Sequence, residues 1–164
     1  MPSIWRHDTP DTPPAAAGML SREREVPLKK QLLRSVTVDS NSLQASGTWA
    51  QCYKAGNQVF MQGQTGIRLE DYETGTVVGV GDPAHQTRIA LDNIRRMMEM
   101  AGGTLDDVVK IIVYVTNRSF RPAVYGEINK AFKGVKPAST GIVVAGLALP
   151  ELLMEIDAWG IVDD

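Results

Sequence analysis

The feature that most constrains this chain is an amphipathic helix followed, after two glycines, by a β-branched run. Asp82-Pro83 is a strong helix start, because Asp is favoured at the N-cap and Pro at the first helical position. The spacing of apolar residues predicts a helix from Pro83 to about Ala101, with one face formed by Ala90, Leu91, Ile94, Met97, Met98 and Ala101. Gly102-Gly103 ends this helix, and residues 108–115 then predict a buried strand.

Shorter elements flank this unit on both sides. Strand-like runs at residues 51–55 and 58–61 are joined by Gly56-Asn57, a pair that suits a two-residue hairpin turn. A second amphipathic helix is predicted from apolar residues four positions apart, which are Phe120, Val124, Ile128 and Phe132. Two final strands are predicted at about residues 141–145 and 152–162.

The resulting order, β-β-α-β-α-β-β, predicts an α+β domain with a mixed sheet of five to six strands. Two helices would cover one face of this sheet, and the other face would need a partner. The domain is expected to span residues 47–164. Residues 1–46 contain Pro2, Pro10, Pro13 and Pro14, and are expected to form an arm that packs on the body or on a neighbouring subunit.

Charge and cysteine usage narrow the function. The formal net charge of −2 provides no basic field for a phosphate backbone, so neither nucleic acid binding nor the nuclease alternative is favoured. The single cysteine, Cys52, fits a reducing compartment. With two histidines and no ligand spacing, we expect no metal and no cofactor. The sequence lacks a membrane span and a signal-peptide pattern, so a cytoplasmic protein without membrane partners is expected.

The last predicted strand carries the most informative polar residues. Glu155 and Asp157 lie two positions apart and therefore point to the same face, together with Leu153, Trp159 and Ile161. The residues between them, Met154, Ile156 and Ala158, take the opposite face. A carboxylate among apolar neighbours on a strand lies either at a wet edge or in a functional pocket. From the residues alone, both interpretations stay open.

Several motifs in matching order resemble the RidA (YjgF-type) superfamily. The hairpin run from Lys54 to Gln64 resembles that family's AGNLVFxSGQ motif, and residues 86–94 resemble its first helix. Residues 106–115 resemble its next strand. Its closing signature is similar to the segments Pro137-Ala138, Leu149-Pro150 and Glu155-Ile156-Asp157-Ala158. The similarity covers about residues 49–162, some two-thirds of the chain.

The resemblance implies a chorismate-mutase-like fold and a homotrimeric barrel with its sheets facing inward and three small-molecule clefts between subunits. For typical members it also implies hydrolysis of enamines and imines, such as 2-aminoacrylate, to a 2-keto acid and ammonia. In those members an arginine after Pro-Ala grips the substrate carboxylate through two hydrogen bonds, and the glutamate of the last strand positions the attacking water. Glu155 matches this glutamate and is the expected catalytic residue.

This sequence departs from the family pattern at the arginine. The residue after Pro137-Ala138 is Ser139, which offers one neutral hydrogen bond and no cation. The expected substrate-binding residues are Ser139, Thr140, Tyr125, Trp49, Gln62 and Gly63. Of these, Gln62 replaces a small residue, Tyr125 an asparagine and Trp49 a tyrosine of the family pattern, so the cleft is expected to be larger, more aromatic and less cationic. Arg68, Arg118 and Arg121 are alternative sources of the cation.

Two hypotheses follow for the function. The first is an enzyme that hydrolytically deaminates a non-standard enamine or imine, or performs a related hydrolysis, with Glu155 handling the water. The second is a non-catalytic trimeric ligand-binding or interaction protein that kept the fold. Loss of a charge-assisted arginine contact predicts activity towards 2-iminopropionate that is lower by roughly two to four powers of ten. Ser139→Arg alone is expected to restore little of it.

Overall fold

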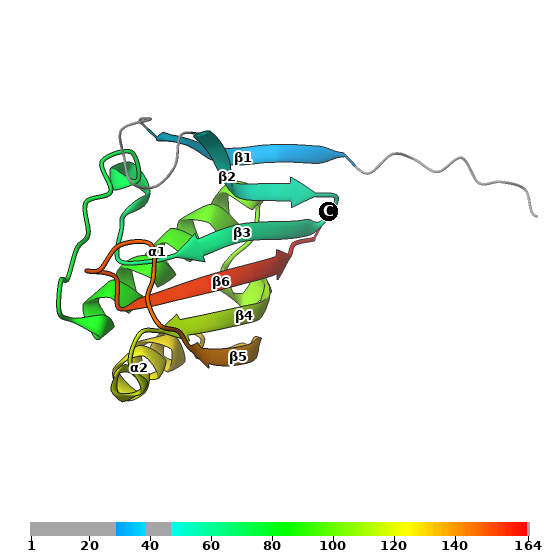
Figure 1. Ribbon diagram of the computed structural model, residues 1–164. Coiled ribbons are helices and arrows are strands. Elements are labelled where there is room, and N and C mark those ends of the chain that lie inside the picture. The colour runs from blue at the N-terminus through cyan, green and yellow to red at the C-terminus, as the bar shows by residue number, and fades with distance from the viewer. Residues whose placement is uncertain (1–28, 39–46, 164) are drawn as a thin grey trace, which may run out of the picture.

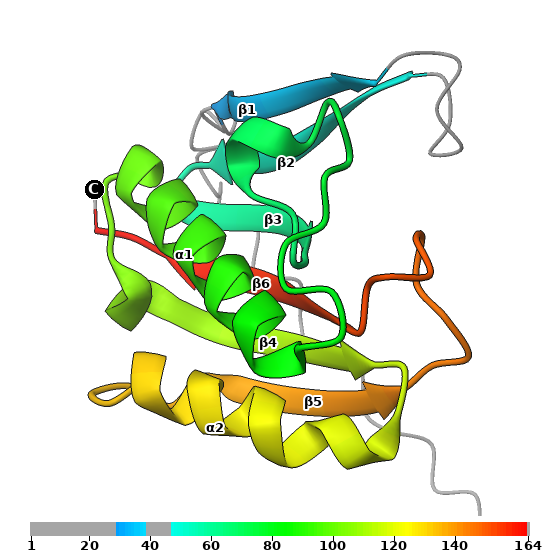
Figure 2. The ribbon, with the colours of Figure 1, turned by 90° about the vertical axis from the view of Figure 1, so that its left-hand side faces the viewer.

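The computed structural model describes residues 29–38 and 47–163, which form one mixed sheet with two helices on one face (Figures 1 and 2). The six strands are β1 Lys30–Val38, β2 Gly47–Ala55, β3 Gln58–Gln64, β4 Val108–Val115, β5 Ala138–Val143 and β6 Met154–Ile161. They lie in the order β1-β2-β3-β6-β4-β5. All neighbouring pairs are antiparallel except β4 and β5, which are parallel. The α+β fold with its mixed sheet is confirmed.

Helix α1 spans Pro83–Ala101, as predicted from its local signals. The Asp82 carboxylate accepts a hydrogen bond from the His85 N–H at 2.9 Å, which satisfies one of the unpaired donors of the first turn. At the other end Gly102 has φ of 90°, a left-handed conformation that glycine adopts without the steric cost of a Cβ atom. Both ends of α1 are therefore set by residues next to it in sequence.

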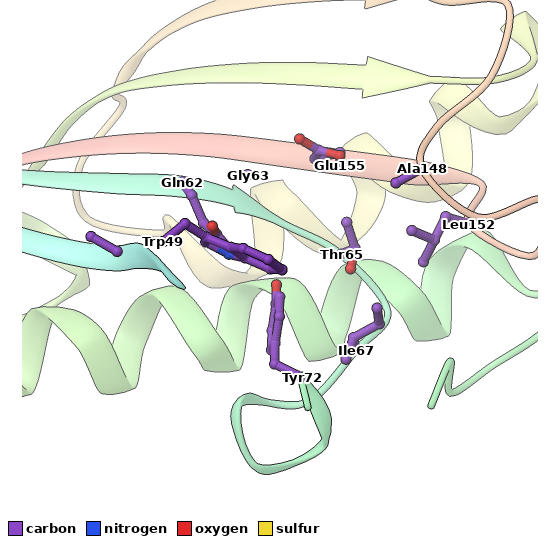
Figure 3. Close-up of a pocket in the computed structure, with 10 residues that line it drawn as sticks. Trp49, Gln62, Gly63, Thr65, Ile67, Tyr72, Ala148, Leu152 and Glu155 are labelled. Atoms are coloured by element: carbon purple, nitrogen blue, oxygen red, sulfur yellow. The ribbon is translucent and has the colours of Figure 1, made fainter. Parts of the chain in front are cut away.

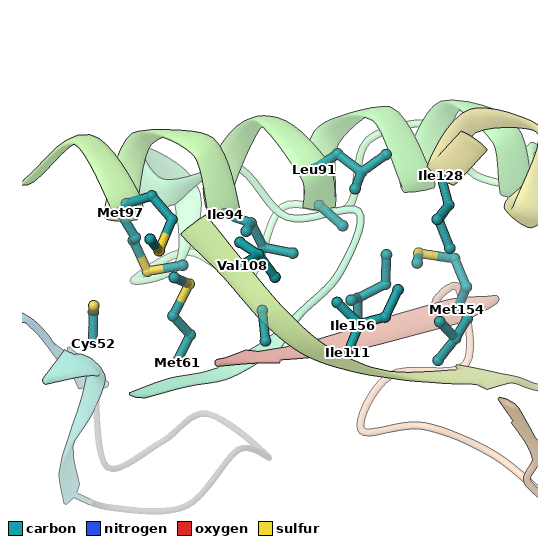
Figure 4. Packing of buried hydrophobic residues seen from close by; sticks show 14 of the residues in the cluster. Cys52, Met61, Leu91, Ile94, Met97, Val108, Ile111, Ile128, Met154 and Ile156 are labelled. Atoms are coloured by element: carbon teal, nitrogen blue, oxygen red, sulfur yellow. The ribbon is translucent and has the colours of Figure 1, made fainter. Parts of the chain in front are cut away.

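The core lies between α1 and the sheet (Figure 4). Helix α1, which packs on strands β3 and β6, contributes the fully buried Ile94, Met97 and Met98. Each such side chain removed from water stabilises the fold by about 1.5–3 kcal/mol. The Cys52 thiol belongs to this core, and burial raises its pKa to about 11, so it stays protonated.

Strands β4 and β5 are joined by helix α2, Arg121–Ala131, in a β-α-β crossover. Val124 and Ile128 form its buried side, as the four-residue spacing predicted. Strand β5 begins at Ala138, three residues earlier than the prediction of about Gly141, so Ser139 and Thr140 are strand residues. All six residues of β5 are exposed, because β5 is an edge of the sheet.

At the opposite edge lies β1, which the sequence analysis had included in the arm. Residues 30–38 pair antiparallel with β2 through the register Lys30↔Ala55 to Val38↔Gly47. An edge strand tolerates the charged residues that hid this segment from a hydrophobic pattern. The rest of the arm, residues 1–28 and 39–46, lies outside the described residues, and the domain division at residue 46 stays a prediction.

The sheet face opposite the helices carries exposed apolar side chains. Phe60 of β3 and Ile161 of β6 are 41% and 47% exposed, and Tyr53 of β2 pairs with Phe60 on the same face. No helix among the described residues is long and apolar enough to cross a bilayer. The bare face that was expected from the element order is present in the chain.

Candidate functional site

A cleft opens where strands β2 and β3 separate. Their last paired residues are Cys52 and Met61, and beyond them the pairing of β3 with β6 shifts register between Met61 and Gln64. A bulge of this kind bends the strand away from its neighbour. The resulting carboxylate cleft has a volume of about 630 Å³ and is lined by Trp49, Ala50, Gln62, Gly63, Thr65, Ile67, Tyr72, Ala148, Leu152 and Glu155 (Figure 3).

Glu155 reaches the cleft from β6, the strand next to β3. Its carboxyl group lies against Gly63, where any Cβ atom would collide with Glu155 Oε1. Gly63 therefore provides the space that the half-buried carboxyl group occupies. Burial raises the pKa of Glu155, and the nearby charge of Asp157 raises it further. A carboxyl group with such a pKa can both accept and release a proton closer to neutral pH.

Tyr72 is a cleft residue that the sequence analysis missed. It follows the short turn η1, Leu69–Asp71, and its hydroxyl donates a hydrogen bond to Gln64 Oε1 at 3.2 Å. Burial raises the pKa of Tyr72 to about 12, so the phenol stays protonated and acts as a hydrogen-bond donor rather than a base. Its position depends on the path of a loop, for which the sequence pattern holds no periodic signal.

Gln86, a buried side chain of α1, fixes the loop that leads into β6. Its Nε2 donates to the carbonyl oxygen of Glu151 at 2.8 Å, and its Oε1 accepts from the Leu153 N–H at 2.8 Å. These bonds lie on either side of Leu152, which lines the cleft. They therefore fix the chain up to Leu153, two residues before Glu155. A buried amide needs partners for its donor and its acceptor, and these bonds supply both.

Asn93, which is also a buried residue of α1, holds the other loop of the cleft. Its Nδ2 donates to the Ile67 carbonyl oxygen at 2.7 Å, and its Oδ1 accepts from the Leu69 N–H at 3.2 Å. Ile67 lines the cleft, and the chain then continues through η1 to Tyr72. The first helix therefore positions both loops of the cleft by hydrogen bonds from its own side chains.

Comparison with known proteins places the chain in a family. The family model described as endoribonuclease L-PSP matches residues 39–162. A RutC family protein of Pyrococcus horikoshii is 34% identical over 126 residues, which cover 77% of this chain and 96% of the relative. The chain belongs to the RidA (YjgF-type) superfamily.

Other members of the RidA superfamily show the same fold and, in one case, a named activity. The crystal structure of a Rid family protein from Yersinia pestis superposes with a TM-score of 0.67 at 28% identity, covering 82% of this chain and 100% of that one. A 2-iminobutanoate/2-iminopropanoate deaminase of Dermatophagoides farinae is 30% identical over 106 residues, 63% of this chain and 78% of the relative.

Within one chain, the residues expected from the RidA pattern lie in three places. Four of them, Trp49, Gln62, Gly63 and Glu155, line the carboxylate cleft. Tyr125 and Ser139 instead line a second hollow of about 570 Å³ between α2 and β5, the β5 hollow. Thr140 points to the bare face, where its hydroxyl accepts a hydrogen bond from Lys110 Nζ at 2.7 Å. Within the described chain these residues therefore do not form a single site.

Asp157, the second carboxylate of β6, lies outside the lining of the cleft. Its Oδ2 accepts a hydrogen bond from the Tyr114 hydroxyl at 2.8 Å. Burial raises the pKa of Asp157, and the bond from Tyr114 opposes this effect. In the described parts of the chain, no three His, Cys, Asp or Glu side chains come together in a way that could hold a metal ion.

Proposed function

We propose that this RidA-superfamily protein is a hydrolase that deaminates an imine or enamine in a cleft between subunits of a homotrimer. The observation that carries the proposal is Glu155, a carboxyl group of raised pKa in a cleft lined by Trp49, Gln62 and Gly63. The named deaminase activity of the Dermatophagoides relative supports the same reaction class.

The reaction needs one group that moves protons. Water attacks the imine carbon while Glu155 accepts one of its protons, which forms a C–O bond and a tetrahedral carbinolamine. Glu155 then returns this proton to the nitrogen and transfers the hydroxyl proton of the carbinolamine to the same nitrogen, so the C–N bond breaks, ammonia leaves and the former C=N carbon becomes a ketone. The balance is imine plus water to ketone plus ammonia, so no oxidant or cofactor takes part. The Tyr72 hydroxyl lines the same cleft, with its proton donated to Gln64 Oε1.

The lining of the cleft favours a substrate with an apolar side chain. A volume of about 630 Å³ exceeds what a three-carbon imino acid fills, and Trp49, Ile67 and Leu152 offer it apolar surface. Ser139 cannot supply the paired hydrogen bonds and the charge of an arginine at that position. We therefore expect a larger 2-imino acid to be a better substrate than 2-iminopropionate.

Assembly as a homotrimer would complete the site. The exposed Tyr53, Phe60 and Ile161 on the bare face are apolar surface that a neighbouring copy would cover. Strand β5 is a free edge, so its hollow with Tyr125 could meet the carboxylate cleft of another subunit. Such a contact would place the separated site residues in one inter-subunit cleft.

The experiment compares imino acids that an amino acid oxidase generates in solution, with keto-acid release measured above the spontaneous rate. The imine of leucine should be hydrolysed faster than 2-iminopropionate, whose hydrolysis should lag a typical family deaminase by roughly two to four powers of ten. Comparable rates on 2-iminopropionate would mean that the missing arginine at position 139 has no consequence.

Glu155→Gln tests the proposed acid-base group directly. Because the amide cannot accept the proton of water, the rate should fall by about two to four powers of ten. Asp157→Asn is the matched control, since it removes a carboxylate two residues along the same strand but outside the lining, and it should keep most of the activity. Equal rates for Glu155→Gln and the wild type would reject Glu155 as the catalytic residue.

A ligand-binding protein without catalysis is the second candidate, and Ser139 is the observation that favours it. In that case no imine would be hydrolysed above the spontaneous rate, and Glu155→Gln would change nothing but ligand affinity. Binding of the product keto acids by the inactive protein would then support this candidate over the hydrolase.

A further inference from the structure

The carboxylate cleft lacks a cation for an acidic ligand. None of the described residues that line it is a lysine or an arginine, while Glu155 adds a negative charge when ionised. The position that carries arginine in the family pattern holds Ser139, which lines the separate β5 hollow. An imino acid carries a carboxylate, so its binding would be electrostatically opposed unless another side chain supplies positive charge.

Arg121, the first residue of α2, is positioned next to β5. Its guanidinium carbon lies 4.9 Å from the centroid of the Tyr125 ring, a stacking distance for a cation over an aromatic face. Its Nη1 lies 2.7 Å from where a Cβ atom at Gly141 would be, and the Tyr125 hydroxyl also lies against that position. The absence of a side chain at Gly141 therefore provides the space that both groups occupy.

This pair lies on the same face of β5 as Ser139. Residues two apart on a strand point the same way and are separated by roughly 6–7 Å, so Gly141 follows Ser139 along one side of the strand. Tyr125 links the two positions, because it lines the β5 hollow with Ser139 and also contacts Gly141. A guanidinium is thus present beside the position where the family pattern has its own.

The donors of Arg121 are available to a ligand. Among the described residues no carboxylate lies within ion-pair distance of Arg121, whereas Arg68, the first alternative, contacts Asp71 at 3.8 Å. Stacking on a ring occupies the face of a guanidinium and leaves the N–H groups at its edge free. Arg118, the other alternative, is exposed in the short turn η3, Arg118–Phe120.

We propose that Arg121, stacked on Tyr125 over Gly141, binds the carboxylate of the ligand and replaces the arginine missing at position 139. The inference rests on the proposed function only in taking a carboxylate-bearing small molecule as the ligand. It makes the site selective for acids, because a neutral analogue gains nothing from the guanidinium. Binding by Arg121 also places the ligand carboxylate towards α2, and this position fits a substrate longer than 2-iminopropionate.

Calorimetric titration of the full chain with 2-oxobutanoate tests the proposal without requiring turnover. Arg121→Gln should weaken binding by about tenfold to a hundredfold, the effect of losing charge-assisted hydrogen bonds. Arg118→Gln is the matched control, since it removes the same charge three residues earlier, and its affinity should equal that of the wild type. For 2-butanone, which lacks the carboxylate, wild type and Arg121→Gln should be indistinguishable.

Gly141→Ala separates position from charge. Its methyl group would displace the Arg121 and Tyr125 side-chain ends while every charge is kept, so affinity for 2-oxobutanoate should fall as it does in Arg121→Gln. Both displaced groups are ends of flexible side chains and residue 141 is exposed, so the fold should be retained. Arg121→Lys keeps the charge but loses the fork of two donors, and it should bind more weakly than the wild type.

The outcomes separate this inference from the proposed function. Carboxylate binding that depends on Arg121 in a protein without imine hydrolysis would support the inference and reject the hydrolase. Imine hydrolysis with an unchanged KM in Arg121→Gln would support the hydrolase and overturn the inference. Wild-type protein that does not bind 2-oxobutanoate at millimolar concentration, or that binds it as tightly after Arg121→Gln, would also overturn it.

Discussion

The two faces of strand β6 differ in whether other elements of the same chain cover them. On the helix side Met154, Ile156 and Ala158 are fully buried by elements of the same chain. On the bare side Glu155 and Asp157 alternate with them, and Ile161 remains 47% exposed. One strand therefore contributes to the core with one face and carries two carboxyl groups on the other. The core is covered within the chain, whereas the bare side keeps apolar side chains exposed.

The difference shows why the site residues appear scattered. Strand geometry puts alternate residues on opposite faces, so a face that is not core can hold polar groups without disturbing the fold. The carboxylate of Glu155 on the bare side and the guanidinium of Arg121 on the α2 side each occupy space that a glycine leaves open, at Gly63 and at Gly141. Each group is positioned within the chain, and only the proposed trimer would bring the two together.

Identical substitutions on the two faces should give the largest difference. Ile156→Ala, at a fully buried position, should lower the free energy of unfolding by about 2–5 kcal/mol, the cost of lost burial and the remaining cavity. Ile161→Ala, at the half-exposed position, should cost less than about 1 kcal/mol in the folding of a single chain. Urea denaturation of both variants gives the two values.

Equal costs for Ile156→Ala and Ile161→Ala would contradict the distinction between the faces. A cost for Ile161→Ala that grows with protein concentration would sharpen it, because such a dependence reports assembly rather than folding. The loss of unfolding free energy in Ile156→Ala should not depend on protein concentration, provided that the degree of assembly stays the same.

A charge placed on the bare face should disrupt assembly with a smaller energetic effect. Phe60 is 41% exposed, so covering the rest of its side chain contributes on the order of 1 kcal/mol per subunit. Phe60→Lys loses this contribution of the covered side chain and adds the cost of burying an ammonium group. Association of the subunits should therefore weaken at least about tenfold. Sedimentation velocity at several protein concentrations measures the change.

The matched control for assembly is Met100→Lys, a 45% exposed apolar residue on α1. It introduces the same charge on the helix side and should leave the sedimentation profile unchanged. A wild-type chain that sediments as a monomer at micromolar concentration would contradict the proposed trimer. Loss of assembly in Met100→Lys alone would place the interface on the helices instead.

The sequence predicted the elements whose signals are local. Helix α1 and strand β4 match their predicted bounds of 83–101 and 108–115, because caps, glycines and β-branched residues act next to them in the chain. Strand β1 was missed because Lys30 and Arg34 interrupt its apolar residues, as an edge strand allows. The alternation of β6 was predicted correctly, since it needs only the two-residue period of a strand.

The contents of the site were predictable only where a motif carried them. Glu155 and Gly63 follow from the family resemblance, and both lie in the carboxylate cleft. Tyr72 was missed because its position depends on Asn93, which holds the loop at Ile67 from 26 residues further along the sequence. The choice among three arginines stayed open because stacking of Arg121 on Tyr125 over Gly141 is a tertiary contact.

The smallest expected effect is a pH dependence of folding stability, which substitutions on the bare face should change and substitutions on the helix side should not. A carboxyl group whose pKa is raised in the folded state binds its proton more tightly there than in the unfolded chain, so folding stability is greatest below the ordinary carboxyl pKa and falls as pH rises through the folded value. The pKa of Glu155 is raised, chiefly by burial, so Glu155→Gln should remove this loss. The unfolding free energy of Glu155→Gln minus that of the wild type should therefore increase from pH 4 to pH 8, measured by urea denaturation at one protein concentration.

Asp157→Asn and Ile156→Ala test the origin of this pH dependence. Asp157→Asn should change with pH in the same direction but by less, because the hydrogen bond from Tyr114 stabilises the ionised form and opposes the burial that raises the pKa of Asp157. Ile156→Ala should show a cost that does not change with pH, since no titrating group is removed from the helix side. A wild type that gains stability relative to Glu155→Gln as pH rises would mean that the Glu155 carboxylate is stabilised in the folded cleft. A positive group, such as the guanidinium of a neighbouring subunit's Arg121, would then have to lie close enough to outweigh burial.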